Sequence, residues 1–184
     1  MRFILASQSP RRRELLQKLN IPFLVQVADV DETMDKDLPL TEAVARLSLR
    51  KAKAVAGGQD DIVIAADTIV VLGNTVLGKP RDEKDAFQML KSLSGRSHQV
   101  MTGVTVLKGD TFRCHTEVTE VFFRELTDEE IAAYIATKDP MDKAGSYGIQ
   151  NGGALFVEKI QGDYFNVVGL PVCRLGLMLK EFGL

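Results

Sequence analysis

Residues 62–72 give the strongest strand signal in the sequence. Apolar side chains occupy both alternating positions of this stretch, so both faces of the strand must be covered, as in the centre of an α/β sheet. Asp67 interrupts the apolar run. An isolated buried carboxylate is costly unless it finds a cation or a metal, and a purely structural Asp in a central strand is the rarer case. Asp67 is therefore the principal candidate for a catalytic residue or a metal ligand.

The first turn of the chain predicts an anion-binding site. Residues 3–6 are typical of a short buried strand, Ser9 suits the N-cap of a helix and Pro10 suits its first position. Arg11 and Arg12 follow at the positive end of the helix dipole, where cations are unfavourable. Solvated surface arginines are the alternative. A bound phosphate would compensate the charge, and it would receive bonds from unpaired backbone N–H groups and from the guanidinium forks.

A short acidic segment, residues 29–33, follows a second predicted strand at residues 23–27. It contains Glu32, and carboxylates that come soon after a phosphate-binding turn could hold a hard cation. A solvated acidic turn explains the same residues equally well. The sequence leaves both interpretations open.

Two lysines are placed where they could meet the same anion. Lys51 lies in a predicted helix at residues 41–56, with Thr41 as N-cap, and it shares a face with the apolar stripe. A snorkelling lysine is the alternative, but the central position favours an amine that ends near an internal anion. Lys79 follows a predicted hairpin turn that should bring it back alongside the Asp67 strand.

The remaining helices and strands follow without a linker or an internal repeat. Helical patterns follow Asp82, a capping box at residues 127–130, and Pro171, and antiparallel strands are predicted at residues 99–107 and 111–123. We therefore expect one compact unit rather than two independent domains.

Glycine and histidine give weaker signals. Six of the fifteen glycines fall between Gly145 and Gly169, which favours backbone turns close to a ligand, with a series of hairpin turns as the simpler alternative. His98 and His115 have no partner at nucleophile or metal-ligand spacing. Surface or hairpin positions are expected for both.

The composition restricts the class of function. The 184 residues are 45% hydrophobic, and 25 acidic against 23 basic side chains leave a net charge of −2. This balance argues against a nucleic-acid partner, so an anionic ligand needs locally gathered cations. Cys114 and Cys173 lack metal spacing and are expected to be buried thiols in a reducing compartment. No apolar run approaches the ~20 residues of a membrane span, so we expect a cytoplasmic protein.

Six short motifs resemble those of the Maf family. In chain order they are Ser7-Gln8-Ser9-Pro10-Arg11-Arg12, Asp29-Val30-Asp31-Glu32-Thr33, Ala66-Asp67-Thr68, Gly78-Lys79-Pro80, Asp142-Lys143-Ala144-Gly145 and Val168-Gly169-Leu170-Pro171. The match runs from residue 3 to the C-terminus and is highly specific. The resemblance implies an α/β fold similar to inosine triphosphatases, with an elongated mixed sheet, surrounding helices and a cleft between two lobes, in a single domain over residues 1–184.

The same resemblance implies a nucleoside triphosphate pyrophosphatase that cleaves between the α and β phosphates. Asp67 would accept a proton, and Glu32 with Asp67 would hold a divalent metal, Mg²⁺ or Mn²⁺. Since an aspartate is a weak base towards free water, we expect a metal-activated water that Asp67 orients. The residues implied for phosphate binding are Ser7, Arg12, Lys51 and Lys79, and those implied for substrate choice are Arg11, Thr68 and Gln150.

Within the family, the motifs resemble the branch that acts on dTTP and UTP. A Gln amide can donate to O4 and accept from N3–H of uracil or thymine, whereas cytosine presents the reverse pattern. Two positions differ from the family pattern: Ser146 stands where Ala is common, and Asn151 stands where Gly is usual.

Two other functions stay open. One is the same chemistry on non-standard purine or 7-methyl-GTP nucleotides in a house-cleaning role. The other is a nucleotide-sensing protein that acts in septum formation and cell-division arrest. A homodimer is compatible with the sequence.

Overall fold

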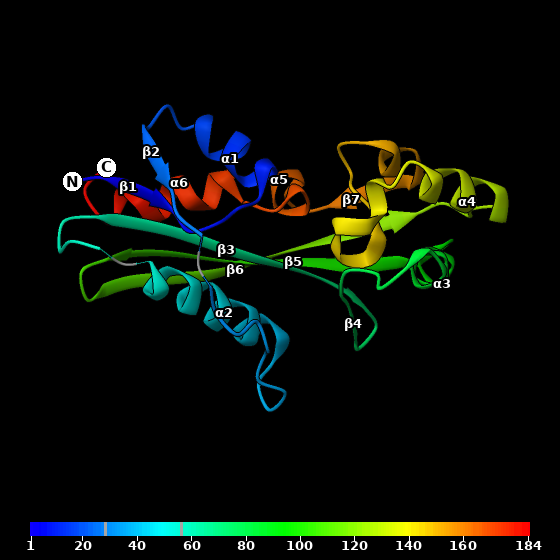
Figure 1. The fold of residues 1–184 in the computed structure, drawn as a ribbon, viewed down its shortest axis with the longest axis horizontal. Helices are drawn as coiled ribbons and strands as arrows, with labels where there is room; N and C mark the ends of the chain where they lie inside the picture. The colour runs from blue at the N-terminus through cyan, green and yellow to red at the C-terminus, as the bar shows by residue number, and fades with distance from the viewer. Residues whose placement is uncertain (28, 56) are drawn as a thin grey trace. The chain divides into compact units, whose positions relative to one another are not determined.

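In the computed structural model, the chain folds around a mixed β-sheet (Figure 1). The structure describes residues 1–27, 29–55 and 57–184. The strands are β1 (Phe3–Leu5), β2 (Phe23–Val25), β3 (Ile62–Leu72), β4 (Thr75–Leu77), β5 (Ser97–Lys108), β6 (Thr111–Phe123) and β7 (Val157–Gln161). Their order is β2-β1-β3-β5-β6-β7, with β4 paired to β3. β1 pairs parallel with β2 and β3, whereas the β3–β4 and β6–β7 pairs are antiparallel, so the predicted mixed sheet is confirmed.

Helices connect these strands. The α-helices are α1 (Pro10–Gln17), α2 (Leu40–Ala54), α3 (Glu83–Leu93), α4 (Asp128–Ala136), α5 (Tyr164–Val168) and α6 (Val172–Lys180). Short 3₁₀ helices follow α4, namely η1 (Asp139–Asp142), η2 (Ala144–Ser146) and η3 (Gly152–Phe156). Within the three described ranges, none of the helices combines the length and the apolar character that crossing a membrane requires.

The chain divides into two compact units, each assembled from segments that are distant in sequence. The first unit contains Met1–Thr68, Thr102–Glu117 and Gly169–Leu184, and the second contains Ile69–Met101 and Val118–Val168. Strands β3, β5 and β6 contribute residues to both units. The single domain over residues 1–184 and the cleft between lobes stay predictions.

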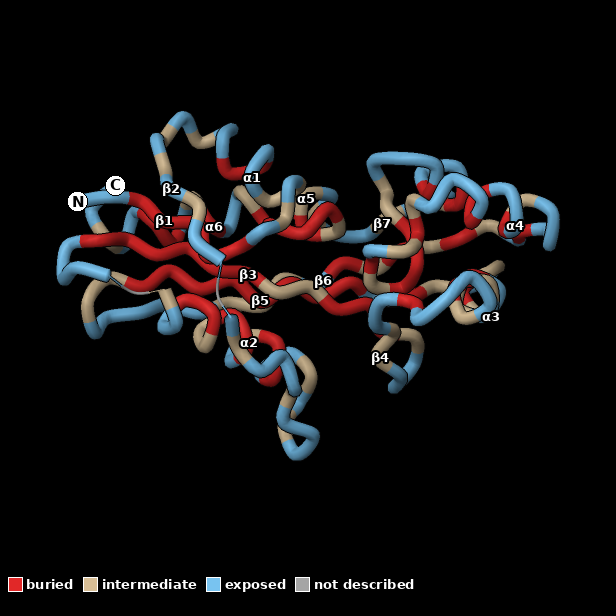
Figure 2. The backbone as a smooth tube through the Cα atoms, in the orientation of Figure 1, coloured by how far each residue is buried: buried red, intermediate tan, exposed pale blue. Residues whose placement is uncertain are grey.

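The first unit is built around the first half of β3. Residues 62–66 are at most 1% exposed, so the predicted burial of both strand faces is confirmed (Figure 2). Helices α1 and α6 lie on one side of β3 and α2 lies on the other (Figure 1). A glycine at position 103 lets α2 approach β5, because a Cβ there would lie only 2.4 Å from the carbonyl oxygen of Val44.

The second unit has an aromatic core. The rings of Phe123 and Tyr147 pack edge to face at 4.8 Å. His98 belongs to this core: it is 2% exposed, and its Nε2 lies 2.7 Å from the Tyr147 hydroxyl. The surface or hairpin position expected for His98 is therefore wrong, because a hydrogen bond to Tyr147 and packing against the rings of Tyr147 and Phe123 allow the neutral ring to be buried. Burial lowers the pKa of His98 to about 4.

Several local predictions can be compared with the structure. The side chains of Ser9, Asp82 and Thr127 cap their helices as predicted. Thr41 does not, because α2 begins one residue earlier, after the extended Pro39. The predicted end of that helix, residue 56, lies outside the described residues.

The two cysteines were expected to be buried, and this is wrong. Cys114 and Cys173 are both exposed. Cys114 lies in the exposed first part of β6, and Cys173 lies in the first turn of α6, away from the buried residues of that helix. Neither takes part in a disulfide.

Candidate functional site

The turn between β1 and α1 has the features of an anion site. The Ser7 hydroxyl accepts a hydrogen bond from the Ser9 N–H at 3.2 Å, and Ser9 caps α1 by accepting from the Arg12 N–H at 3.5 Å. Pro10 follows the cap at the first position of the helix, where its missing N–H has no partner to lose. The first turn of α1 contains no acidic side chain. Its positive dipole end is therefore not neutralised from within the helix.

Arg12 is fixed by three acceptors. Its Nε donates to the carbonyl oxygen of Gly169 at 2.8 Å, Nη2 donates to Thr68 Oγ1 at 3.0 Å, and Nη1 donates to Ser7 Oγ at 3.4 Å. Burial lowers the pKa of Arg12, and the negative charge of Asp67 opposes that effect. All three acceptors are neutral, so the positive charge of the guanidinium is not cancelled by them.

Lys51 connects two carboxylates. Its Nζ lies 2.5 Å from Asp67 Oδ1 and 2.7 Å from Glu32 Oε1. The side chains of Lys51 and Asp67 are 11% and 15% exposed, whereas that of Glu32 is 69% exposed. Lys51 therefore ends at an internal carboxylate, as its position on the helix predicted, and the ammonium explains how an Asp is tolerated in a central strand.

The arginine group and the lysine group form one site. Asp67 and Thr68 are adjacent in β3, and Thr68 is bonded to Arg12. The negative charges of Asp67 and Glu32 both raise the pKa of Arg12, while the neighbouring Arg11 lowers it. The first unit thus brings together the predicted residues Ser7, Arg11, Arg12, Glu32, Lys51, Asp67 and Thr68.

Two further residues support this site and were missed from the sequence. Thr102 is 0% exposed, and its hydroxyl lies 2.9 Å from that of Thr68. Gly169 supplies the carbonyl that holds Arg12, and its φ of +126° favours glycine. A polar residue within the apolar strand β5 was the available signal for Thr102. Gly169 lies in a recognised motif, but its partner is distant in sequence.

The remaining two predicted residues belong to the second unit. Lys79 follows β4, Gln150 lies between η2 and η3, and both residues are exposed. Their participation in the site stays a prediction.

The carboxylates of Glu32 and Asp67 are suitable donors for a hard cation. They already converge on one positive group, the Lys51 ammonium, at 2.7 and 2.5 Å. Mg²⁺ commonly binds through one or two carboxylates together with substrate phosphates. Among the residues that the structure describes, no group of three or more His, Cys, Asp and Glu side chains could hold a metal alone. The residues present therefore fit a cation that shares its ligands with a bound phosphate.

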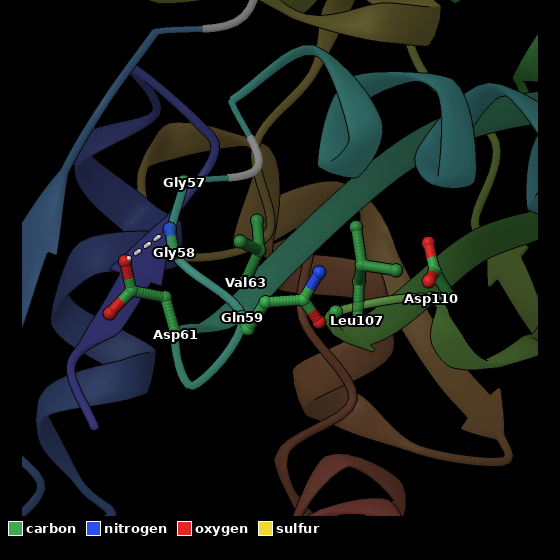
Figure 3. A pocket seen from close by; sticks show the side chains of 8 residues that line it. Gly57, Gly58, Gln59, Asp61, Val63, Leu107 and Asp110 are labelled. Atoms are coloured by element: carbon green, nitrogen blue, oxygen red, sulfur yellow. Dashed lines mark hydrogen bonds between the residues drawn. The ribbon is translucent and has the colours of Figure 1, made fainter.

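A separate hollow of about 190 Å³ lies at the start of β3 (Figure 3). Its principal charged group, Asp61, is paired with Arg2 at 2.6 Å and accepts from the Gly58 N–H at 3.0 Å. These bonds hold the pKa of Asp61 at about 2. None of the predicted site residues lines this hollow, whose walls are Gly57, Gly58, Gln59, Asp61, Val63, Leu107, Gly109 and Asp110.

Solved structures with the same fold are known. A HAM1 protein from Coxiella burnetii matches with a TM-score of 0.54 over 98% of this chain and 99% of that chain, at 17% identity. The Ham1 protein of Staphylococcus aureus matches with a TM-score of 0.50 over 98% and 99%, at 13% identity. These likenesses confirm the predicted fold and carry no information about the reaction.

Closer relatives are found by sequence. A protein named dTTP/UTP pyrophosphatase from Bacillus cytotoxicus is 53% identical over 98% of this chain and 95% of its own. Proteins of the same name from Alkaliphilus oremlandii and Bacillus cereus are 53% and 51% identical, and they cover 97% and 100% of this chain and 94% and 96% of their own. The pattern of the family described as Maf-like protein matches residues 2–182. The chain therefore belongs to the Maf family.

Proposed function

We propose that the chain hydrolyses dTTP and UTP to the nucleoside monophosphate and pyrophosphate. Relatives that are 51–53% identical over nearly the full length are named for this activity. One observation carries the proposal. Arg12, which donates three hydrogen bonds, lies in the same unit as the charged side chains of Lys51, Asp67 and Glu32.

The triphosphate would bind at the start of α1. The positive end of the α1 dipole would attract the phosphates, and the Arg12 guanidinium would donate to their oxygens. Ser7 and Lys51 add a hydroxyl and an ammonium to the same site. Lys79, from the second unit, is proposed as a further cation for the phosphates.

Asp67 would orient the attacking water and receive its proton. As the water oxygen bonds to the α phosphorus, the bond from that phosphorus to the α,β-bridging oxygen breaks, and pyrophosphate leaves with its charge held by Arg12 and the lysines. Glu32 and Asp67 would hold a divalent cation, Mg²⁺ or Mn²⁺, which when bound neutralises phosphate charge and makes a water molecule more acidic.

Base selection is assigned to Arg11, Thr68 and Gln150. The Gln150 amide can match O4 and N3–H of uracil or thymine, and cytosine would leave polar groups unpaired. The Thr68 hydroxyl is oriented by Arg12 and Thr102, which fixes the direction in which it can contribute.

A nucleotide panel scored for pyrophosphate release, with and without Mg²⁺, tests the proposal. We expect dTTP and UTP to be preferred and Mg²⁺ to be required. Preference for dITP or 7-methyl-GTP would favour the purine alternative, and full activity in a chelator would contradict the metal-assisted reaction.

Replacement of Asp67 separates an enzyme from a nucleotide sensor. Asp67→Asn should lower kcat by roughly 10²- to 10⁴-fold, the range of general acid–base catalysis, while nucleotide binding persists. Asp61→Asn, which changes a carboxylate just before the same strand, should leave kcat near the wild-type value. An unchanged rate in Asp67→Asn would favour the sensor, or a different catalytic residue.

A homodimer and a cytoplasmic location stay predictions from the sequence. Light scattering of the purified chain tests the first, and fractionation of cells tests the second.

A further inference from the structure

The proposed base-reading residue lies in a tight turn of the second unit. Gln150 is an exposed residue of the four-residue segment 148–151, which is closed by a hydrogen bond from the Asn151 N–H to the Gly148 carbonyl at 3.3 Å. This turn lies between η2 and η3, in the yellow part of the chain in Figure 1. An exposed side chain on a turn selects a base only if the turn itself is held in place.

Both ends of this turn are tied to one carboxylate, that of Asp139. At one end, the Gly148 N–H donates to the Tyr134 hydroxyl at 3.0 Å, and this hydroxyl donates to Asp139 Oδ2 at 2.6 Å. At the other end, Asn151 Nδ2 donates to Asp139 Oδ1 at 2.7 Å. Asn151 directly follows Gln150, and its side chain holds this end of the turn to Asp139. A glycine, which is usual at this position in the family, could not form that bond.

Asp139 is itself held by Lys143. The ammonium lies 3.0 Å from Asp139 Oδ1 and 2.6 Å from the Asp139 carbonyl oxygen, and it also bonds Asp142 at 2.8 Å. Lys143 is only 7% exposed. Burial raises the pKa of Asp139, but hydrogen bonds from Tyr134, Asn151 and Lys143 outweigh burial and leave the pKa below its ordinary value. The anchor of the turn is therefore an ionised carboxylate that accepts hydrogen bonds from three side chains.

The backbone leaves little room for the turn to shift. A Cβ at Gly153 would lie 2.6 Å from the Gly148 carbonyl oxygen, and a Cβ at Gly148 would lie 2.7 Å from Cε of Lys143. The segment is thus packed against its own anchor as well as bonded to it.

We propose that Asp139 is a positioning residue for base selection. By tying Tyr134 and Asn151 to one carboxylate, it fixes the turn that presents Gln150, and its loss relaxes the choice between uracil and cytosine. The inference rests on the proposed function, because it requires that Gln150 contacts the base.

The test compares kcat/KM for UTP and CTP in Asp139→Asn. The amide of the new Asn places an N–H₂ group against hydrogen-bond donors, which loosens the turn. We therefore expect the ratio of kcat/KM for UTP to kcat/KM for CTP to fall roughly tenfold, which corresponds to one misaligned hydrogen bond. The fall should come from a higher KM for UTP. The inhibition constant of inorganic tripolyphosphate, which has no base, should stay at the wild-type value. A purely structural defect would move both quantities together.

The matched control is Asp128→Asn. Asp128 lies in the same unit and pairs with Lys91 at 2.5 Å. It takes no part in the hydrogen bonds described above that hold the turn. We expect a wild-type UTP-to-CTP ratio. Should Asp139→Asn not fold, Asn151→Asp replaces it: a second carboxylate facing Asp139 repels the turn, and the same fall in the ratio is expected.

Gln150→Ala separates the failure of this inference from that of the proposed function. A lower ratio in Gln150→Ala with an unchanged ratio in Asp139→Asn, or in Asn151→Asp where that replaces it, overturns the positioning role alone. An unchanged ratio in Gln150→Ala overturns the assigned base contact and this inference with it. Loss of tripolyphosphate inhibition in Asp139→Asn would also overturn it, because the defect would then extend beyond the base.

Discussion

Arg12 is oriented by hydrogen bonds within the protein. Its guanidinium donates to the carbonyl oxygen of Gly169 and to the hydroxyls of Thr68 and Ser7. Because all three acceptors are neutral, these bonds leave the positive charge of the guanidinium uncompensated. The guanidinium directs a separate nitrogen atom to each of the three acceptors, whereas a lysine has only one donor nitrogen.

Arg12→Lys should therefore impair the site although it keeps the charge. We expect kcat/KM for UTP to fall roughly 10- to 100-fold, because bonds from a charged donor are lost and the remaining ammonium is poorly placed. Steady-state kinetics measure the change. Arg13→Lys, at the exposed neighbouring position, serves as the control and should have no effect. Equal rates for the two variants would contradict a positioned fork.

Lys51 prevents the repulsion of two carboxylates. In Lys51→Met, Asp67 and Glu32 would lose the ammonium that they share, and we expect the free energy of unfolding to fall by about 2 to 3 kcal/mol. Mg²⁺ should recover more stability in this variant than in the wild type, because a cation that binds the native pair stabilises the folded state.

Urea unfolding with Mg²⁺ and with a chelator measures both effects. Lys53→Met is the control, since Lys53 lies on the same helix but is exposed. The same gain from Mg²⁺ in Lys51→Met and wild type would show that the two carboxylates do not share a cation site.

At the level of elements, the contact between α2 and β5 positions Lys51. The helix approaches the strand at Gly103, where a Cβ would lie 2.4 Å from Val44 O and 2.8 Å from Ala45 N. The backbone of α2 would have to shift to accept any larger residue. A shift of the helix also moves the Lys51 ammonium away from β3.

Gly103→Ala should for this reason reduce both stability and activity. We expect a loss of about 1 to 3 kcal/mol in the free energy of unfolding, as for other overpacked sites, with a lower kcat. Gly176→Ala is the matched control, because Gly176 lies in α6 with open space around its Cβ position. This control should be neutral or gain up to about 1 kcal/mol from helix propensity. A stable, fully active Gly103→Ala would contradict the close approach.

Elements with a clear periodicity could be predicted from the sequence. The two-sided apolar run identified β3, and the spacing of the apolar stripe placed Lys51 on the inner face of α2. Thr102, by contrast, gains its role only because β5 lies where its hydroxyl meets Thr68. His98 was misplaced for the same reason: its partner Tyr147 is 49 residues away, and no local pattern predicts a hydrogen bond between such positions.

At the level of the whole molecule, neither unit is a continuous piece of chain. The first unit is formed by three segments and the second by two, and β3, β5 and β6 pass from one unit to the other. Six of the seven site residues of the first unit lie in the recognised motifs, and the seventh, Lys51, was placed by the periodicity of α2. The participation of Lys79 and Gln150 depends on tertiary arrangement, which neither periodicity nor motif spacing encodes.

His98 predicts how the stability of the molecule depends on pH. The pKa of this histidine is about 4 in the folded chain against an ordinary value of 6.5. Between these values the unfolded chain binds a proton at His98 and the folded chain does not, so the free energy of unfolding falls as the pH falls. From pH 6.5 to pH 4.5 we expect a loss of about 2 kcal/mol, measured by urea unfolding.

Other groups contribute in a different pH window. The pKa values of Asp61 and Glu130 are lowered to about 2 by their arginine partners, from ordinary values of 3.8 and 4.5. Their stabilisation is complete above the ordinary values and is lost as the pH falls from there towards 2. His98→Gln should therefore remove most of the dependence above pH 4.5, and His115→Gln, which replaces a histidine of the first unit, is the matched control. If His98→Gln kept the wild-type slope, some other group would be taking up the proton, and the neutral, tyrosine-bound ring in the second core would not be the cause of acid sensitivity.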